Sequence, residues 1–267
     1  MILIEECPNN PDLTKYIDRY QLFISEEPVF IKAIPNGKIE CYLIKKGGFA
    51  RWDNVSEEFI DNASSGIFPA TNRTTFFYIP SHIVCLNIKI NLNILGLQLF
   101  SNLQTNWQSH DISDLIPANE QSYLLSSINE ENPIIDVDKL DAVIERSLSN
   151  YQVDKKVDQI VKLIHEQVTS KFRVTDLANY MNMSPKTLER WVRKQFNLSP
   201  KELLQVIRFE FVSRSLKNQS QRKFMDSTEF GYYDQSHFIK ECQNITGYTP
   251  KEFFSRMKLS TNDLVFE

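Results

Sequence analysis

The chain contains 267 residues, a length that predicts about two domains, and 42% of its residues are hydrophobic, as in ordinary globular proteins. No run of about 18 or more apolar residues occurs, and the segment after Met1 lacks the basic flank and long apolar stretch of a signal peptide, so we expect neither a membrane span nor secretion. The net charge of −4 is unfavourable for contact with a polyanion over the whole surface.

The charge is distributed unevenly along the chain. Residues 1–150 contain 11 Lys and Arg against 20 Asp and Glu, a net charge of −9, whereas residues 151–267 contain 19 against 14, a net charge of +5. An acidic half joined to a basic half suggests that only the second half contacts a polyanion. Chance clustering explains the charges about equally well, so motifs must decide between the two interpretations.

The first 110 or so residues are predicted to form mostly β-strands. Three runs have the β-branched and aromatic composition of half-buried strands, with prolines between them: residues 39–44, 74–79 and 83–90. Short helices are expected beside these strands at residues 13–23 and 93–103. The prediction for this region is a small β-rich domain.

Helical spacing begins after this region. Residues 122–128 and 137–148 are predicted helices of a connector over residues 118–153, which either packs on the first domain or pairs two subunits. The second helix places four apolar side chains on one face: Leu140, Val143, Ile144 and Leu148. From residue 154 onward the chain is predicted to be almost entirely helical, starting with an amphipathic helix whose apolar residues are Val157, Ile160, Val161, Ile164 and Val168.

Residues 173–196 have the pattern of a helix-turn-helix unit. Thr175 is the expected N-cap of the first helix, and residues 182–183 form the turn. Ser184 is the expected N-cap of the second helix, with Pro185 at its first position, where a missing N–H has no cost. The expected inward-facing residues are Leu177, Ala178 and Met181 in the first helix and Leu188 and Val192 in the second.

The outer face of the second helix suits the major groove of DNA, which admits a helix with a polar surface. Arg190 is expected to bind guanine O6 and N7, Glu189 to accept from cytosine N4, and Lys186 to contact a base edge or a phosphate. Phosphate contacts, which position a protein without reading sequence, are expected from Ser184, Arg193 and Lys194. A solvated helix face explains this helix, taken alone, about equally well.

A second copy of the pattern begins 50 residues after Ser184, where Gly231 lies at a turn and Asp234 is the expected N-cap. Phe238 and Cys242 take the inward positions of this helix. Its predicted base-reading residues are Gln235, which suits adenine, Ser236, Ile239, which suits a thymine methyl group, and Lys240, with Gln243 as a phosphate contact. Both copies end alike, at residues 198–204 and 248–254, and residues 202–216 form a helix that links them. The repeat favours a pair of DNA-binding helices over a solvated surface.

Residues 157–257 resemble the C-terminal DNA-binding domain of the AraC/XylS family of bacterial transcription regulators, over about two fifths of the chain. The matching motifs are Asp176-Leu-Ala, Ser184 with Leu188 and Arg190, Ser199-Pro200, Arg208, Gly231-Tyr-x-Asp-Gln-Ser-His-Phe and Gly247-x-Thr-Pro250. The resemblance implies that two recognition helices, joined by a rigid helix, enter successive major grooves on one face of the DNA, about 34 Å apart.

The first half resembles a degenerate cupin-like barrel found in some of these regulators, through residues 35–37, 65–71 and 86–90. The predicted fold class is therefore α+β: a β-rich sensor or pairing domain over residues 1–117, the connector over 118–153, and an all-α domain of two helix-turn-helix units over 154–260. The implied partners are double-stranded promoter DNA and RNA polymerase, and the implied place is the cytoplasmic nucleoid. Pairing of two copies and a small-molecule effector stay open, and no cofactor or metal is implied.

The chain departs from the family pattern in three places, the first of them a pair of residues. Asp226 and Ser227 stand where an apolar residue and a small alanine usually open the second unit. Its first helix is therefore expected to be shifted, with an apolar face made of Phe224, Met225 and Phe230. Asn197 replaces the usual glycine and is expected to adopt the left-handed conformation. Phe254 replaces a common arginine and removes one phosphate contact.

Two other classes of function compete with a DNA-binding regulator. An enzyme is disfavoured, because the four histidines have no metal-ligand spacing and no phosphate loop or nucleophile elbow occurs. The four distant cysteines are expected to be reduced thiols: Cys7, Cys41, Cys85 and Cys242. A ligand pocket is a hypothesis for five aromatic residues that more commonly belong to a core: Trp52, Trp107, Phe76, Phe77 and Tyr78. The last class is a partner-binding module whose DNA affinity is weakened at Asp226 and Ser227.

Overall fold

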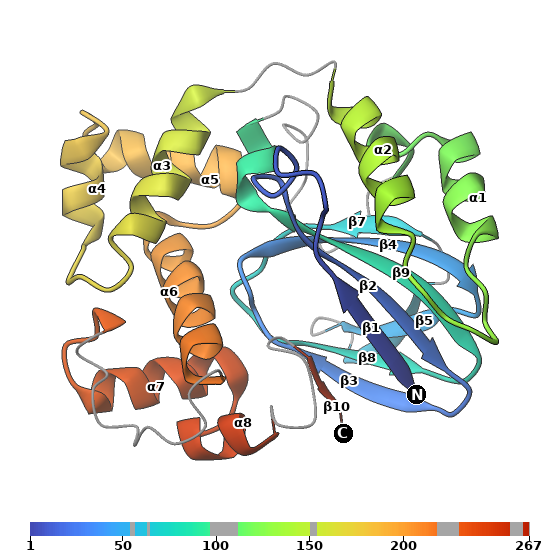
Figure 1. Ribbon diagram of the computed structural model, residues 1–267. Coiled ribbons are helices and arrows are strands. Elements are labelled where there is room, and N and C mark those ends of the chain that lie inside the picture. The colour runs from blue at the N-terminus through green and yellow to red at the C-terminus, as the bar shows by residue number, and fades with distance from the viewer. Residues whose placement is uncertain are drawn as a thin grey trace. The chain divides into compact units, whose positions relative to one another are not determined.

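The computed structural model describes residues 1–53, 57–62, 65–96, 112–149, 154–217, 230–256 and 264–266 (Figure 1). The chain divides into two compact units. The first unit contains Met1–Ile31, Lys38–Pro69 and Phe76–Asp154, and the second contains Lys155–Glu267 together with the short segments Lys32–Gly37 and Ala70–Thr75. No helix within these described ranges is long and apolar enough to cross a membrane.

Two β-sheets form the body of the first unit. The first sheet has the order β1 (Ile2–Glu6), β2 (Ile17–Ser25), β9 (Ile83–Asn91), β4 (Lys38–Lys46) and β7 (Gly66–Phe68), and these neighbours run antiparallel. In the second sheet β3 (Val29–Ala33), β8 (Thr75–Ile79), β5 (Phe49–Asp53) and β6 (Glu58–Asn62) lie in that order. The strands expected at residues 39–44, 74–79 and 83–90 are confirmed as β4, β8 and β9, with small shifts at their ends.

The helix expected at residues 13–23 is wrong, because this segment contains most of β2, which pairs with β1 on one side and with β9 on the other. Every residue of β2 is buried or half-buried, so the segment lacks the alternation that distinguishes a strand from a helix. Of the helix expected at residues 93–103, the short 3-10 helix η1 (Leu92–Gly96) is described, and the remainder lies outside the described residues.

Helices α1 (Ala118–Ser126) and α2 (Val137–Leu148), which follow the short 3-10 helix η3 (Ile112–Asp114), lie beside the first sheet and confirm the two helices expected in the connector (Figure 1). A buried polar contact ties α2 to this unit. The Tyr20 hydroxyl donates to Oδ1 of Asp141 at 2.7 Å, and the Asn10 backbone N–H donates to Oδ2 at 2.7 Å. Burial, together with this carboxylate, raises the pKa of Tyr20 far above its ordinary value, so the phenol keeps its proton and continues to donate.

Helices make up most of the second unit. In chain order they are α3 (Lys155–Glu166), α4 (Val174–Tyr180), α5 (Pro185–Phe196), α6 (Pro200–Lys217), α7 (Gln235–Thr246) and α8 (Pro250–Arg256), and a short strand β10 (Leu264–Phe266) follows. In Figure 1, α6 extends from the group α3–α5 to the pair α7–α8. Its Phe209 and Val212 belong to a buried cluster with Phe238, Cys242 and Phe253, so the linking helix expected over residues 202–216 is confirmed.

The second unit also contains a tight joint between the loop that follows α3 and the turn that precedes α7. Gly231 has φ +74°, and a Cβ atom added to it would clash with the carbonyl oxygen of Ser170 and lie 3.0 Å from that of Val168. Arg208 of α6 donates from Nη2 to the carbonyl oxygen of Phe172 in the same loop at 3.3 Å. Both the backbone conformation and the close approach therefore require glycine at position 231.

The cysteines are free thiols, and only Cys7 is exposed among the four. Burial raises the pKa of Cys85 to about 12. It raises the pKa of Cys242 to about 12 as well, against the opposing effect of a hydrogen bond with Thr246. Both therefore remain protonated at neutral pH, and Cys242 acts as a small apolar residue in the core.

Removal of the Asp141 carboxylate is expected to destabilise the first unit. Asp141→Ala leaves the buried Tyr20 hydroxyl and the Asn10 N–H without their acceptor, which costs about 3 kcal/mol of unfolding free energy. Asp138→Ala is the matched control, because that carboxylate binds the Asn9 amide on the exposed surface and its loss costs below about 0.5 kcal/mol. Urea unfolding followed by circular dichroism measures both, and equal losses would contradict this role of Asp141.

Substitution at the joint is expected to be costly. Gly231→Ala must place a side chain against a backbone carbonyl in a left-handed conformation, for a loss of about 3 kcal/mol or more. Gly247→Ala is the control, since that residue also has a positive φ (+76°) but its Cβ atom would meet only the end of a flexible lysine side chain, and about 1 kcal/mol is expected. Chemical unfolding of both variants checks the difference, and a Gly231 variant no less stable than the Gly247 variant would exclude a tight joint.

Candidate nucleic-acid interface

Helix α5 has the start, the end and the buried face that its sequence predicts. The Ser184 side chain accepts a hydrogen bond from the Thr187 backbone N–H at 3.2 Å, and Pro185 occupies the first turn. Asn197 ends the helix with φ 59°, which confirms the left-handed conformation expected there. The buried side chains of α5 are Leu188, Val192 and Phe196. These contacts fix which face of α5 is turned outward.

Helix α4 supports α5 from the position expected, but its N-cap differs from the prediction. The helix begins two residues earlier than expected, at Val174, so Thr175 is inside the first turn and is not the cap. Asp176 instead accepts a hydrogen bond from the Arg173 backbone N–H at 2.8 Å, and its negative charge near the helix start is favourable. Leu177 and Ala178 are buried, as expected, and the turn that follows is made by Asn182 with φ 52°.

The outer face of α5 carries four cations within one short helix. Lys186, Arg190, Arg193 and Lys194 are all exposed, and Glu189 is half-buried. Arg193 Nε donates to Glu189 Oε1 at 2.6 Å, an ion pair across one turn. The carboxylate that was expected to accept from cytosine is therefore occupied by a neighbouring arginine, whereas Arg190 projects from the exposed face next to it.

Helix α7 repeats this construction. Asp234 accepts a hydrogen bond from the His237 backbone N–H at 2.7 Å, Phe238 and Cys242 are buried, and Gly247 ends the helix with φ 76°. Exposed on the outer face are Gln235, Ser236, Lys240 and Gln243, and Ile239 is half-buried. The expected N-cap and the expected inward face are both present. The supporting helix predicted around Phe224 and Met225, including Asp226 and Ser227, lies outside the described residues.

Helices α5 and α7 are each followed by the same capped turn. Ser199 donates its N–H to Glu202 Oε2 at 2.7 Å before α6, and Thr249 donates its N–H to Glu252 Oε2 at 2.9 Å before α8. In both cases the glutamate N–H donates back to the hydroxyl oxygen of the cap residue. Hydrogen bonds from the Thr249 side chain and backbone lower the pKa of Glu252. The similar segments 198–204 and 248–254 are thus similar because each contains a capping box.

A buried carboxylate on the inner face of α7 was missed by sequence reasoning. Glu241 is 3% exposed, and its Oε2 accepts a hydrogen bond from Gln205 Nε2 of α6 at 2.9 Å. Helical spacing places residue 241 on the same face as Phe238, Cys242 and Ile245. This spacing alone predicts that residue 241 faces inward, although a glutamate occupies the position. Tyr232 is fully buried beside it, and burial raises the pKa of that phenol well above its ordinary value.

The aromatic residues proposed to line a ligand pocket lie on two different faces. Trp52 and Tyr78 both contact Phe59, on the same face of the second sheet, and Phe76 is two residues from Tyr78 on the strand. Phe77 lies on the opposite face and packs against Phe49 with ring centroids 5.4 Å apart. Trp107 lies outside the described residues. The set therefore does not form one lining.

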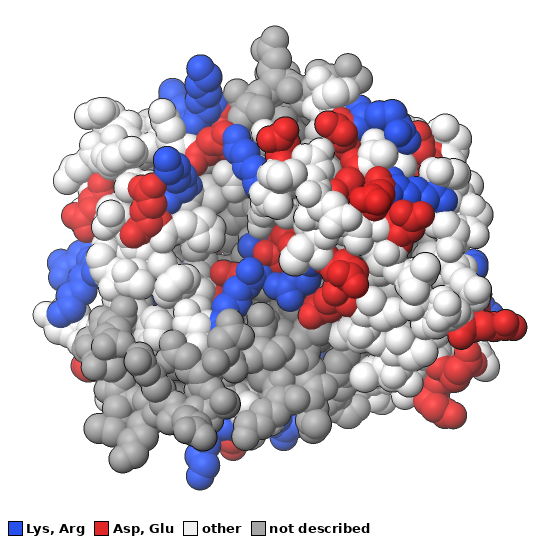
Figure 2. All heavy atoms as spheres, viewed as in Figure 1, with Lys and Arg blue, Asp and Glu red and all other residues white. Residues whose placement is uncertain are grey.

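On the face drawn in Figure 2, and among the residues that the structure describes, neither charge nor metal-ligand chemistry marks a second candidate site. Figure 2 shows acidic and basic side chains interspersed over the face in view, without a broad basic patch among the residues described there. No group of three or more His, Cys, Asp or Glu side chains in the described part of the chain could hold a metal ion. The outward faces of α5 and α7 are the candidate interface because both helices have a capped start, a buried apolar face and exposed polar side chains.

Comparison with known proteins places these helices in a family context. A helix-turn-helix domain family matches residues 177–256. The Msm operon regulatory protein of Streptococcus mutans is 29% identical over 161 residues, which cover 58% of this chain and 55% of that protein. The transcriptional activator PerA of Escherichia coli is 26% identical over 163 residues, which cover 61% of this chain and 55% of that protein. The chain thus matches about half the length of these curated relatives.

A solved structure supports the overall architecture. ToxT from Vibrio cholerae aligns with a TM-score of 0.51 at 15% identity, over 88% of this chain and 98% of that chain. At this identity the likeness shows the fold, a β-rich N-terminal part followed by a helical part, which confirms the predicted α+β class. The two curated relatives are named as an operon regulatory protein and a transcriptional activator. Residues 177–256 of the chain therefore match a helix-turn-helix domain family, and the chain is similar in sequence to the Msm operon regulatory protein and to the transcriptional activator PerA.

Proposed function

We propose that this chain is a sequence-specific DNA-binding transcription regulator that inserts α5 and α7 into successive major grooves of promoter DNA. The observation that carries the proposal is the repeat itself: two helices of 12 residues, each with a capped start, a buried face and an exposed polar face. A polar helix face of this kind fits the major groove. The relatives named as regulators support the same function.

The side chains on the two helices suggest which residues read bases and which contact phosphates. On α5, Arg190 is the strongest candidate base reader because its guanidinium is exposed and can bind guanine O6 and N7 together. Glu189 would have to leave Arg193 to accept from cytosine, so we assign it a smaller part in reading and Arg193 a phosphate contact. Lys186 reads a base or a phosphate, and the remaining phosphate contacts are Ser184 and Lys194.

On α7 the exposed side chains are mostly uncharged. Gln235 suits adenine N6 and N7, and Ile239 suits a thymine methyl group, although it is only half exposed. Ser236 and Lys240 complete the reading face, and Gln243 contacts a phosphate. This face offers fewer strong contacts than α5, so we expect α5 to supply most of the sequence discrimination.

Regulation and partners are part of the same proposal. Since PerA is named a transcriptional activator, we propose that this chain also activates transcription by contacting RNA polymerase, with pairing of two copies through the N-terminal unit. We further propose control by a small molecule in that unit. One solved ToxT structure, with a TM-score of 0.50, holds an unsaturated fatty acid.

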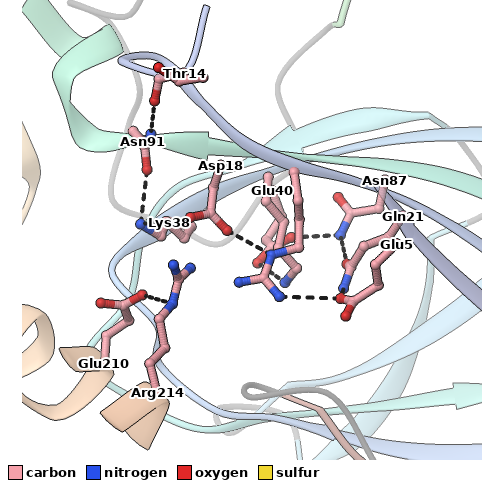
Figure 3. Close-up of polar contacts among 12 residues, drawn as sticks. Glu5, Thr14, Asp18, Gln21, Lys38, Glu40, Asn87, Asn91, Glu210 and Arg214 are labelled. Carbon is pink, nitrogen blue, oxygen red and sulfur yellow. Dashed lines mark hydrogen bonds and ion pairs between the residues drawn. The ribbon is translucent and has the colours of Figure 1, made fainter. Parts of the chain in front are cut away.

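An observation in the first unit supports an effector. The face of the first sheet that carries Tyr42 also carries a buried polar network, and Figure 3 shows its members Gln21, Glu40 and Asn87. In this network Lys89, 1% exposed, pairs with Glu40 at 2.9 Å. Asn87 donates from Nδ2 to Gln21 at 2.9 Å and to Glu40 at 2.7 Å, while its buried Oδ1 accepts no hydrogen bond among the described residues. Since a buried acceptor without a partner is costly, a ligand that donates to Asn87 would be stabilised.

The effector proposal is tested by thermal shift on the full chain. A panel containing an unsaturated fatty acid and neutral sugars is expected to contain a compound that raises Tm at concentrations above its Kd. The shift should be lost in Asn87→Leu, which removes the acceptor at similar side-chain volume. If no compound raises Tm, or if the variant keeps the whole shift, the proposed effector contact is wrong.

The base-reading role of Arg190 is tested by binding to a selected DNA site and to its single-base variants. Arg190→Ala is expected to cost about 1–3 kcal/mol at one base position and to relax the preference there. Lys194→Ala should weaken binding on all sequences alike and make its salt dependence shallower. Lys162→Ala is the control, because this exposed lysine of α3 pairs with Glu166 and should change neither property.

Three results would overturn parts of this assignment. Unchanged discrimination in Arg190→Ala would exclude that residue as a base reader. Salt-insensitive binding of the unmodified chain would exclude a DNA-binding function. Binding that is equal on all sequences would favour the alternative, a partner-binding module with a weakened DNA-binding domain.

A further inference from the structure

We propose that Lys171 and Tyr233, held together at the joint between α3 and α7, bind one DNA phosphate beside the groove that α7 enters. This contact belongs to neither recognition helix and reads no sequence. The inference rests on the proposed function and adds to it a positioning site for the second helix-turn-helix unit.

The two side chains come from segments that the joint fixes against each other. The carbonyl oxygens of Val168 and Ser170 lie so close to Gly231 that no side chain fits between them. Arg208 binds the carbonyl oxygen of Phe172 on the other side of Lys171. Residue 171 therefore sits between two anchored neighbours, and its backbone position relative to the turn at 231–233 is set by close packing.

On this joint the Lys171 ammonium lies over the Tyr233 ring, with Nζ 4.7 Å from the ring centroid. Both side chains are exposed, and Tyr233 is 66% accessible. A cation over an aromatic face is attracted by the ring quadrupole and loses freedom before any ligand arrives. The pair thus offers a charged donor and a hydroxyl donor from one prearranged place on the surface.

A phosphate is the ligand that this place favours. Tyr233 directly precedes Asp234, the N-cap of α7, so it lies just outside the helix, and groups at helix N-termini are among those that contact phosphate oxygens in protein–DNA complexes. The outer face of α7 has one lysine, Lys240, where α5 has four cations. Helix α7 itself therefore brings little positive charge to a phosphate, and Lys171 adds one positive charge beside the start of this helix.

The experiment measures the salt dependence of binding for the full chain, on a selected duplex and on an unrelated one. Lys171→Ala should lower affinity on both duplexes alike, and the slope of log K against log salt should become shallower by about 0.9. The loss relative to the unmodified chain should therefore shrink about 3.5-fold between 50 and 200 mM salt. Tyr233→Phe keeps the ring under the ammonium, so it should lower affinity and leave the slope unchanged.

A neutral methylphosphonate placed at single positions of the duplex identifies the phosphate. At one position beside the second groove, the unmodified chain and Lys171→Ala should bind with equal affinity, because the contact is already absent. The control Lys162→Ala should keep the full slope on every duplex. Melting temperatures of all variants, which should match the unmodified chain because both side chains are exposed, separate loss of contact from loss of fold.

The outcomes distinguish this inference from the function on which it rests. An unchanged slope in Lys171→Ala, while Arg190→Ala still loses discrimination, would overturn the phosphate contact and leave the regulator intact. A slope near zero for the unmodified chain would overturn both. A slope change that no methylphosphonate position cancels would show that Lys171 acts only through long-range charge, and would also exclude the contact.

Discussion

Helix α6 buries apolar side chains on several of its sides, and this property holds the second unit together. Its buried residues Leu203, Leu204, Val206, Ile207, Phe209 and Val212 do not keep to one stripe. A helix of this kind must be covered from several directions. It contacts α3, α4 and α5 at one end, and its other end belongs to the cluster that buries α7 and α8. The outward faces of α5 and α7 follow from this constraint, since their apolar sides are used against the supporting helices.

The joint at Gly231 adds a second connection between the same elements. Packing along α6 alone would allow its two ends to bend relative to each other, whereas the contact of Gly231 with Ser170 ties the turn before α7 directly to the loop after α3. Glu241 of α7 adds a polar contact with α6, because its carboxylate accepts a hydrogen bond from Gln205 within a largely apolar contact. The spacing of the two recognition helices is therefore set by several short-range contacts within one unit.

Much of the second unit could be predicted because its signals are local. Ser184 and Asp234 cap helices by their own chemistry, Asn197 takes the left-handed conformation, and the buried faces follow helical spacing. The start of α4 was misplaced because Thr175 and Asp176 are both suitable residues there, and only the geometry shows that the Asp176 carboxylate reaches back to the Arg173 N–H. The sequence does not decide which of two neighbouring residues of this type satisfies the start of a helix.

The errors in the first unit come from contacts between distant segments. The burial of β2 on both faces depends on β1 and β9, and its sequence alone resembles a helix. The polar network of Gln21, Glu40, Asn87 and Lys89 brings together residues from three strands, and nothing in any one strand marks them as partners. Glu241 and Gln205 are likewise 36 residues apart. A residue pattern along the chain does not show which distant segments pair with each other.

The proposed function requires one chain to read DNA with two helices on one face of the duplex. Selection of bound duplexes from a random-sequence pool by the full chain, followed by sequencing, tests this requirement directly. We expect two blocks of base preference whose centres lie about 10–10.5 base pairs apart, with the stronger block belonging to α5 and changed by Arg190→Ala. A single block, two blocks offset by about half a helical turn, or no enrichment would contradict this expectation.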